Sequence, residues 1–81
     1  MFMGKHQVKA RNAKKLKVFG KNLKKLRTEK GWSQEKLAAR AGVSENTIVT
    51  LEAGRLNTTI ATCFDIAKAL GVDAAQLFLF N

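Results

Sequence analysis

Few side chains in this 81-residue sequence have the chemistry of a catalyst. It contains one histidine, His6, one cysteine, Cys63, and no tyrosine, so it offers few candidates for a general acid, a general base or a nucleophile. His6 has no other metal-binding side chain near it in the sequence, and Cys63 has no second cysteine to pair with. We therefore expect no enzymatic activity, no bound metal and no cofactor.

The basic side chains are concentrated at the N-terminal end. The first thirty residues contain 11 Lys and Arg against a single acid, Glu29, so this part carries +10 while the whole chain carries +9. So uneven a distribution is typical of proteins that neutralise phosphates, on nucleic acid or on an anionic membrane surface. The alternative is a solvated tail that aids solubility and binds nothing.

The length of the chain and its helix-ending and helix-capping residues predict one small all-α domain of five helices. A chain of 81 residues has room for one core, and its 46% apolar residues are enough to build it. Four glycines each follow a segment with helical spacing and are expected to end it in the left-handed conformation. These are Gly31, Gly42, Gly54 and Gly71. The expected N-caps are Ser33, Ser44, Thr58 or Thr59, and Asp73, the last with Gln76 in a capping box.

The predicted helices cover about residues 16–30, 34–41 and 45–53, the segment from the threonine cap to Gly71, and the residues from Ala74 onward. Residues 1–15 lack an apolar stripe, so we expect a basic, mobile arm that can extend the first helix, with the domain itself in residues 16–81. Gly20 weakens the prediction of the first helix slightly. No stretch alternates as a strand should, except for a short segment at the C-terminal end.

Apolar residues at helical spacing indicate the core. In the first helix they are Phe19, Leu23 and Leu26. In the fourth helix they form two neighbouring stripes that together make a wide apolar face: Ile60, Phe64 and Ala67, and beside them Cys63, Ile66 and Leu70. Cys63 is thus expected to be a core residue, and Trp32 to fill the junction of the first two helices.

The two short middle helices are separated by only Gly42, Val43 and Ser44, which is the connection of a helix-turn-helix unit. Ala38 is small enough for the close crossing that so short a turn imposes. Ile48 and Leu51 can pin the second of these helices on the first. Its remaining positions face outward near its N-terminus, the part that enters a DNA major groove when such a helix reads bases.

This stretch resembles the helix-turn-helix of the phage repressor and Cro type, often called the XRE family. The resemblance is carried by Gln34, Leu37, Ala38, Ala41, Gly42, Val43, Ser44, Ile48, Leu51, Glu52 and Gly54. It extends over roughly residues 17–78, including the "AKALGVD" segment of the fourth and fifth helices. The family implies a compact helical domain that binds double-stranded DNA as a homodimer.

The resemblance also implies roles for individual residues. Base edges are met by Glu45, Asn46, Val49 and Thr50, although Val49 departs from the polar residue usual at its position. Phosphates are met by Gln34, Ser44, Thr47, Arg55, Asn57 and, on the first helix, Lys24. Arg27 and Glu52 correspond to a pair that forms a salt bridge in some members.

Alternatives remain for the base-reading residues. Asn46 can pair with adenine or be a solvated residue, and Glu45 can accept a hydrogen bond from cytosine or only stabilise the helix dipole. Val49 can meet a thymine methyl group or be tolerated at the surface. Because no Arg or Lys lies between Glu45 and Ala53, guanine readout by arginine is not expected, and affinity must depend on the arm and the first helix.

The apolar C-terminal end predicts a dimer surface formed by Leu77, Leu79 and Phe80, because helix geometry can direct only some of these side chains into the core. The alternative is an end that folds back on its own core. From these features we expect a cytoplasmic transcriptional regulator, associated with the nucleoid through DNA, that binds a palindromic operator as a repressor or restriction-modification controller. An antitoxin that binds a protein toxin is the alternative function. A membrane-surface or RNA-binding module would explain the basic arm but not the helix-turn-helix pattern.

Overall fold

The computed structural model describes residues 2–55 and 58–79. They form four α-helices and a 3₁₀-helix, with no strand in these two ranges. The elements are α1 (Phe2–Glu29), α2 (Gln34–Ala41), α3 (Glu45–Glu52), α4 (Ile60–Leu70) and η1 (Ala74–Phe78). The predicted all-α class is confirmed, with a 3₁₀-helix in the place of the fifth α-helix.

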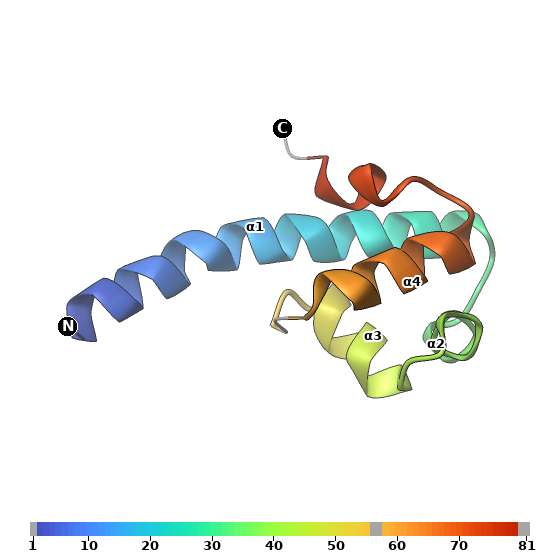
Figure 1. Cartoon of the computed structure of the whole chain (residues 1–81), viewed down its shortest axis with the longest axis horizontal. Helices are drawn as coiled ribbons and strands as arrows, with labels where there is room; N and C mark the ends of the chain where they lie inside the picture. The colour runs from blue at the N-terminus through green and yellow to red at the C-terminus, as the bar shows by residue number, and fades with distance from the viewer. Residues whose placement is uncertain (1, 56–57, 80–81) are drawn as a thin grey trace.

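The first helix is longer than its apolar stripe, because the segment expected as an arm extends it, as the sequence allowed. It begins at Phe2, so the segment expected as an arm continues α1, and in Figure 1 its blue end projects past the rest of the molecule. The apolar stripe, which predicts a helix start near Leu16, indicates only the part of the helix that packs against a core. The lysines, alanines and glutamine before it favour a helix through their intrinsic propensity.

Local capping holds the short helices in place. The side chains of Ser33, Ser44 and Thr59 each accept a hydrogen bond from the backbone N–H three residues later, as the sequence predicts. Gly42 and Gly71 end α2 and α4 with φ of 74° and 72°. The predicted capping box at the start of η1 is wrong, because the Asp73 side chain makes no cap hydrogen bond. The Asp73 carbonyl instead accepts a hydrogen bond from the Gln76 N–H at 2.9 Å, since the backbone hydrogen bonds of a 3₁₀-helix span three residues.

The core lies between α1, α2, α3, α4 and η1 and is made by eleven buried apolar side chains. They are Phe19, Leu23, Leu37, Ala38, Ile48, Leu51, Cys63, Ile66, Ala67, Leu70 and Leu77. Leu77 is fully buried, so its prediction as a dimer-surface residue is wrong: η1 folds back and inserts this side chain into the protomer's own core. Cys63 is a core residue as expected.

Two predicted core residues of α4 are instead exposed. Ile60 is 72% and Phe64 59% exposed, whereas Cys63, Ile66, Ala67 and Leu70 are buried. The apolar face of α4 is wider than the surface that α2 and η1 cover, so its edge is left in contact with solvent.

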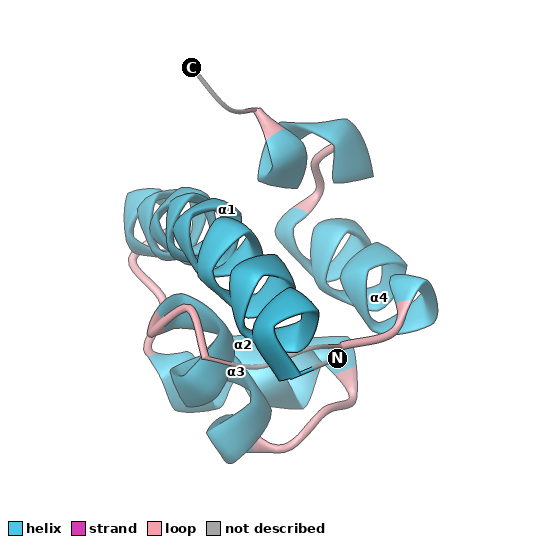
Figure 2. Cartoon of the chain, turned by 90° about the vertical axis from the view of Figure 1, so that its left-hand side faces the viewer, coloured by secondary structure: helices cyan, strands magenta, loops and turns pink. Residues whose placement is uncertain are grey.

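A polar side chain fastens the C-terminal segment to α1. The Asn22 side-chain amide donates to the carbonyls of Leu77 at 3.2 Å and Leu79 at 3.1 Å, and the rings of Phe19 and Phe78 pack with their centroids 5.1 Å apart. Figure 2 shows η1 and α4 on one side of α1 and the α2–α3 pair below it. Phe80 lies outside the described residues.

The C-terminal end of α3 rests directly on the backbone of α1. Gly20 is buried at this crossing, and a Cβ there would lie 2.5 Å from the Leu51 carbonyl oxygen and 2.6 Å from that of Glu52. Gly54, with φ of 74°, is equally close to Lys17: an added Cβ there would lie 2.8 Å from the Lys17 Cγ and 2.9 Å from its Cα. This close approach fixes the position of α3 on α1. It also explains why a glycine is found in the middle of α1, since a residue with a Cβ would not fit there.

Candidate nucleic-acid interface

The turn between α2 and α3 has the geometry that the helix-turn-helix pattern predicts. The backbone N–H of Gly42 and that of Val43 both donate to the carbonyl of Ala38, which closes the end of α2. Ser44 then starts α3, and Ile48 and Leu51 turn the opposite face of this helix into the core. Three residues are thus enough to redirect the chain from one helix into the next.

The outward face of α3 presents the predicted base-reading residues together. Glu45, Asn46 and Val49 are exposed and lie on the side opposite Ile48 and Leu51. In α3 the first two of these are at the N-terminal end, where the unpaired N–H groups also lie. The face is therefore open to a partner and carries donors and acceptors that match base edges.

Thr50 is less open than its neighbours on this face. It is half-buried, and its hydroxyl donates back to the carbonyls of Asn46 at 2.8 Å and Thr47 at 3.2 Å. This local bonding competes with any outside partner. In this structure the Thr50 hydroxyl is therefore already engaged within its own helix.

Ser44 and Thr47 form a capping unit at the start of α3. The Ser44 Oγ accepts from the Thr47 N–H at 3.1 Å, and the two hydroxyls are hydrogen-bonded at 2.8 Å. Capping of this kind stabilises the helix by roughly 1 kcal/mol. Both residues therefore have a structural role that stands beside the phosphate contact implied by the family resemblance.

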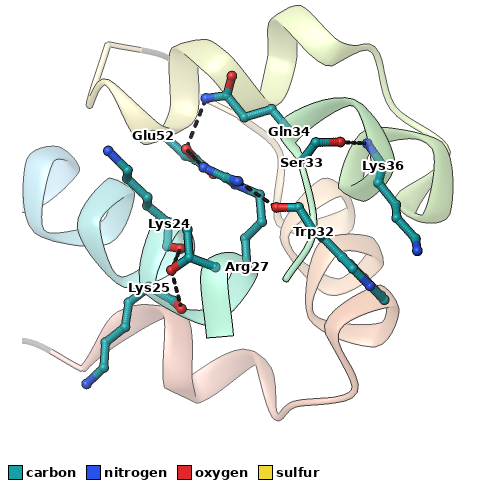
Figure 3. Close-up of polar contacts among 9 residues, drawn as sticks. Lys24, Lys25, Arg27, Trp32, Ser33, Gln34, Lys36 and Glu52 are labelled. Carbon is teal, nitrogen blue, oxygen red and sulfur yellow. Dashed lines mark hydrogen bonds and ion pairs between the residues drawn. The ribbon is translucent and has the colours of Figure 1, made fainter. Parts of the chain in front are cut away.

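A buried ion pair joins α1 to α3, as the resemblance implies. The Arg27 Nε donates to Glu52 Oε2 at 2.6 Å and its Nη2 to Oε1 at 3.0 Å, with side chains only 10% and 5% exposed. The remaining nitrogen, Nη1, donates to the Trp32 carbonyl at 2.7 Å. The hydrogen bond and the attraction of Glu52 outweigh desolvation and raise the pKa of Arg27 above its usual value. One guanidinium thus holds three segments of the chain together (Figure 3).

Gln34 joins the same network, which the sequence did not reveal. Its side-chain amide donates to Glu52 Oε1 at 3.0 Å, so the first residue of α2 is tied to the last residue of α3 (Figure 3). The amide is thereby oriented in the absence of DNA. The backbone N–H of Gln34 lies in the first turn of α2, where the helix has no internal acceptor for it and the dipole favours an anion.

Two of the other predicted phosphate contacts, Lys24 and Arg55, are among the described residues. Lys24 and Arg55 are exposed, and the backbone N–H of Arg55 donates to the Thr50 carbonyl at 3.0 Å, which holds the start of the α3–α4 loop. Asn57 lies outside the described residues. The part of the chain that the structure describes contains no group of three side chains that could hold a metal, and none of its helices has the length and apolarity to cross a membrane.

Trp32 fills the α1–α2 junction as predicted, but its surroundings were not foreseen. It is half-buried against the core, and three cations lie over its ring, Lys30 at 5.2 Å, Arg40 at 5.3 Å and Lys36 at 5.7 Å. Each contributes a cation–π attraction of about 0.5–1 kcal/mol at a site this exposed. The spacing of Lys36 and Arg40 by one helical turn was the available signal.

Comparisons with known proteins agree with this geometry. Residues 23–77 match the family described as Helix-turn-helix (HTH_3). An uncharacterized HTH-type transcriptional regulator, y4dJ of Sinorhizobium fredii, is 44% identical over 61 residues, covering 75% of this chain and 79% of the relative. A more distant relative, the antitoxin HipB of Escherichia coli, is 38% identical over 48 residues, covering 59% of this chain and 54% of the relative.

Solved structures show the same arrangement of helices. The restriction-modification controller protein C.AhdI from Aeromonas hydrophila superposes with a TM-score of 0.76 at 36% identity, covering 78% of this chain and 96% of that one. The hypothetical transcription factor NHTF from Neisseria gives a TM-score of 0.77 at 37% identity, covering 80% and 75% of the two chains. From the family match, these relatives and the α2–α3 geometry, the chain belongs to the Cro/C1-type helix-turn-helix family of DNA-binding transcriptional regulators.

Proposed function

We propose that this protein is a sequence-specific regulator that binds a palindromic double-stranded operator as a homodimer and acts in the cytoplasm without catalytic activity. The observation that carries the proposal is the exposed N-terminal face of α3, held rigidly by the Arg27–Glu52–Gln34 network. A fixed, exposed helix end with amide and carboxylate side chains is what direct readout in the major groove requires. Control of a restriction-modification operon is one role of this kind, since C.AhdI is such a controller.

We assign the contacts in two groups. Base edges are met by Glu45, Asn46, Val49 and Thr50, and phosphates by Gln34, Ser44, Thr47, Arg55, Asn57 and Lys24. Within the first group Asn46 is the principal reader, because its amide offers a donor and an acceptor that match the major-groove edge of adenine.

Selection of bound duplexes from a random DNA pool tests the proposal. We expect a short palindrome to emerge. Asn46→Ala should then weaken binding to the selected duplex by about 1–3 kcal/mol and binding to a scrambled duplex hardly at all. Lys24→Ala is the control, because removing a charge that meets a phosphate weakens binding to both duplexes alike. A pool that yields no common sequence would contradict sequence-specific binding, and equal effects of Asn46→Ala on both duplexes would remove it from base readout.

We also propose where the protomers meet. Ile60 and Phe64 lie one helical turn apart on α4 and are largely exposed, and Leu79 is 64% exposed beyond η1. Apolar side chains of this size favour burial against a second copy, and a two-fold axis would present two copies of α3 to a palindrome. Leu79 keeps its predicted role in the dimer, as does Phe80, whereas Leu77 is replaced by the α4 residues.

Sedimentation of the double variant Ile60→Ser/Phe64→Ser tests this interface. A monomer is expected, with the helical content unchanged because neither side chain is in the core. Ala61→Ser, also exposed on α4, is the control. A variant that remains dimeric would place the interface elsewhere.

The similarity to the antitoxin HipB supports a second candidate, in which the main partner is a protein toxin. Affinity capture with the protein encoded by a neighbouring gene would distinguish the two functions. A stable complex that needs no DNA and survives Asn46→Ala would favour the antitoxin function.

A further inference from the structure

Four lysines form a continuous stripe on the outer face of α1. Lys14, Lys17, Lys21 and Lys24 follow one another at intervals of three, four and three residues, and all four are exposed. Because successive residues of a helix are turned by about 100°, this spacing keeps the side chains on one face. We call this set the lysine stripe.

The lysine stripe adjoins the DNA-reading unit. The backbone and Cγ of Lys17 lie against Gly54, at the turn that follows α3. The opposite edge of α1 carries Phe19 and Asn22, which hold the C-terminal segment. The stripe is therefore on the side of α1 that faces the end of α3, and it continues the surface that begins with Arg55. In Figure 1 the N-terminal half of α1 extends beyond the connection between α3 and α4.

Within the described residues, no acidic side chain forms an ion pair with a lysine of the stripe. Among the side chains that the structure describes, the one ion pair is Arg27–Glu52, and Glu29 is the only acid in α1. Lysines three and four residues apart repel one another and disfavour the helix that carries them. A surface with regularly spaced negative charges would remove this repulsion, and the phosphate backbone of a duplex is such a surface.

We propose that the lysine stripe binds the DNA backbone beside the segment read by α3, so that each protomer contacts more of the duplex than its helix-turn-helix alone. The match to the helix-turn-helix family begins at residue 23, so three of the four lysines lie outside it. The inference rests on the proposed function for the duplex that it uses, but it concerns a separate surface. It adds Lys14, Lys17 and Lys21 to the phosphate contacts.

Salt dependence of binding to a random-sequence duplex tests the stripe by itself. The triple variant Lys14→Gln/Lys17→Gln/Lys21→Gln keeps good helix formers and removes three charges. With a duplex of about 40 base pairs, the slope of log K against log salt should become shallower by about 0.9 for each phosphate that is no longer neutralised, or roughly 2.7 per protomer. The control Lys68→Gln removes an exposed charge on α4, to which no DNA contact is assigned, and should change the slope much less per charge removed.

Hydroxyl-radical footprints on the sequence selected from the random pool give the second readout. Wild type should protect backbone sugars outside those covered by the stripe variant, while the backbone positions protected beside the segment read by α3 stay the same. Equal changes of slope per charge removed in the stripe variant and in Lys68→Gln, or identical footprints, would overturn the inference and leave the proposed function intact. A stripe variant that no longer binds phosphatidylserine vesicles but still binds DNA as wild type does would also overturn it, in favour of a membrane surface. If no sequence is selected from the pool but the salt slope of the stripe variant is still shallower than that of wild type, the proposed function is contradicted and the inference about the lysine stripe holds.

Discussion

Gly20→Ala tests the close crossing of α1 and α3. The added Cβ would lie 2.5 Å from the Leu51 oxygen and 2.6 Å from the Glu52 oxygen, whereas ordinary contacts begin at 3.4 Å. Both neighbours are backbone atoms, so no side chain can rotate out of the way. The two helices must therefore separate by about 0.9 Å at this point, which also pulls Glu52 away from Arg27.

Two effects of opposite sign decide the outcome. Alanine is a better helix former than glycine by about 1 kcal/mol, which would stabilise α1. Overpacking a tight contact costs about 1–3 kcal/mol, and the clash with two carbonyls places this site in the upper half of that range. The net expectation is a decrease of about 1–2 kcal/mol in the free energy of unfolding.

Urea denaturation followed by far-UV circular dichroism measures this decrease. Ala39→Gly, at an exposed position inside α2, isolates the helix-propensity term and should cost about 1 kcal/mol by itself. A Gly20→Ala variant that is at least as stable as wild type would refute the close contact between α1 and α3 at this position. In that case helix propensity alone would govern the site.

Three other perturbations have expected outcomes. Arg27→Met leaves the Glu52 carboxylate buried without its charge partner and should cost about 3–5 kcal/mol in urea denaturation; a cost below about 1 kcal/mol would show that the pair is solvated. Asn22→Ala removes both bonds to the C-terminal carbonyls, so amide hydrogens of η1 should exchange faster while those of α3 keep their protection; unchanged exchange in η1 would contradict the proposed fastening. Burial raises the pKa of the Cys63 thiol, so its contribution to stability is complete below the unfolded pKa of 9.0 and is lost as pH rises from there through the folded pKa. Cys63→Val should remove this part of the alkaline decline in unfolding free energy, and an identical pH profile for the variant would refute it.

The features predicted correctly from the sequence are those set by neighbouring residues. Ser33 and Ser44 act within three residues of themselves, and Gly42 needs only its own φ, so their effects can be read without the tertiary structure. The face of α3 follows from helical spacing once the turn is placed. For the same reason the helix-turn-helix could be identified before any packing was known.

The features missed depend on distant parts of the chain. Whether Ile60 is buried depends on how much of α4 its neighbours cover, and the burial of Leu77 depends on the return of η1 to α1. Spacing identifies an apolar face but not the area available to cover it. The bond from Gln34 to Glu52 likewise joins two positions 18 residues apart, to which the sequence assigned separate roles, a phosphate contact for Gln34 and an ion pair with Arg27 for Glu52.

The surroundings of Trp32 give the protein an optical reporter at the α1–α2 junction. It is the only tryptophan and the chain has no tyrosine, so near-ultraviolet emission comes from one half-buried indole. The field of a nearby cation shifts the excited state of an indole ring, and here the charged ends of Lys30, Lys36 and Arg40 lie 5.2, 5.7 and 5.3 Å from the ring centre. A bound polyanion that draws these side chains away would change the emission wavelength. Fluorescence titration without any label would then follow both unfolding of the helix-turn-helix and its occupancy, using light absorbed at a single site.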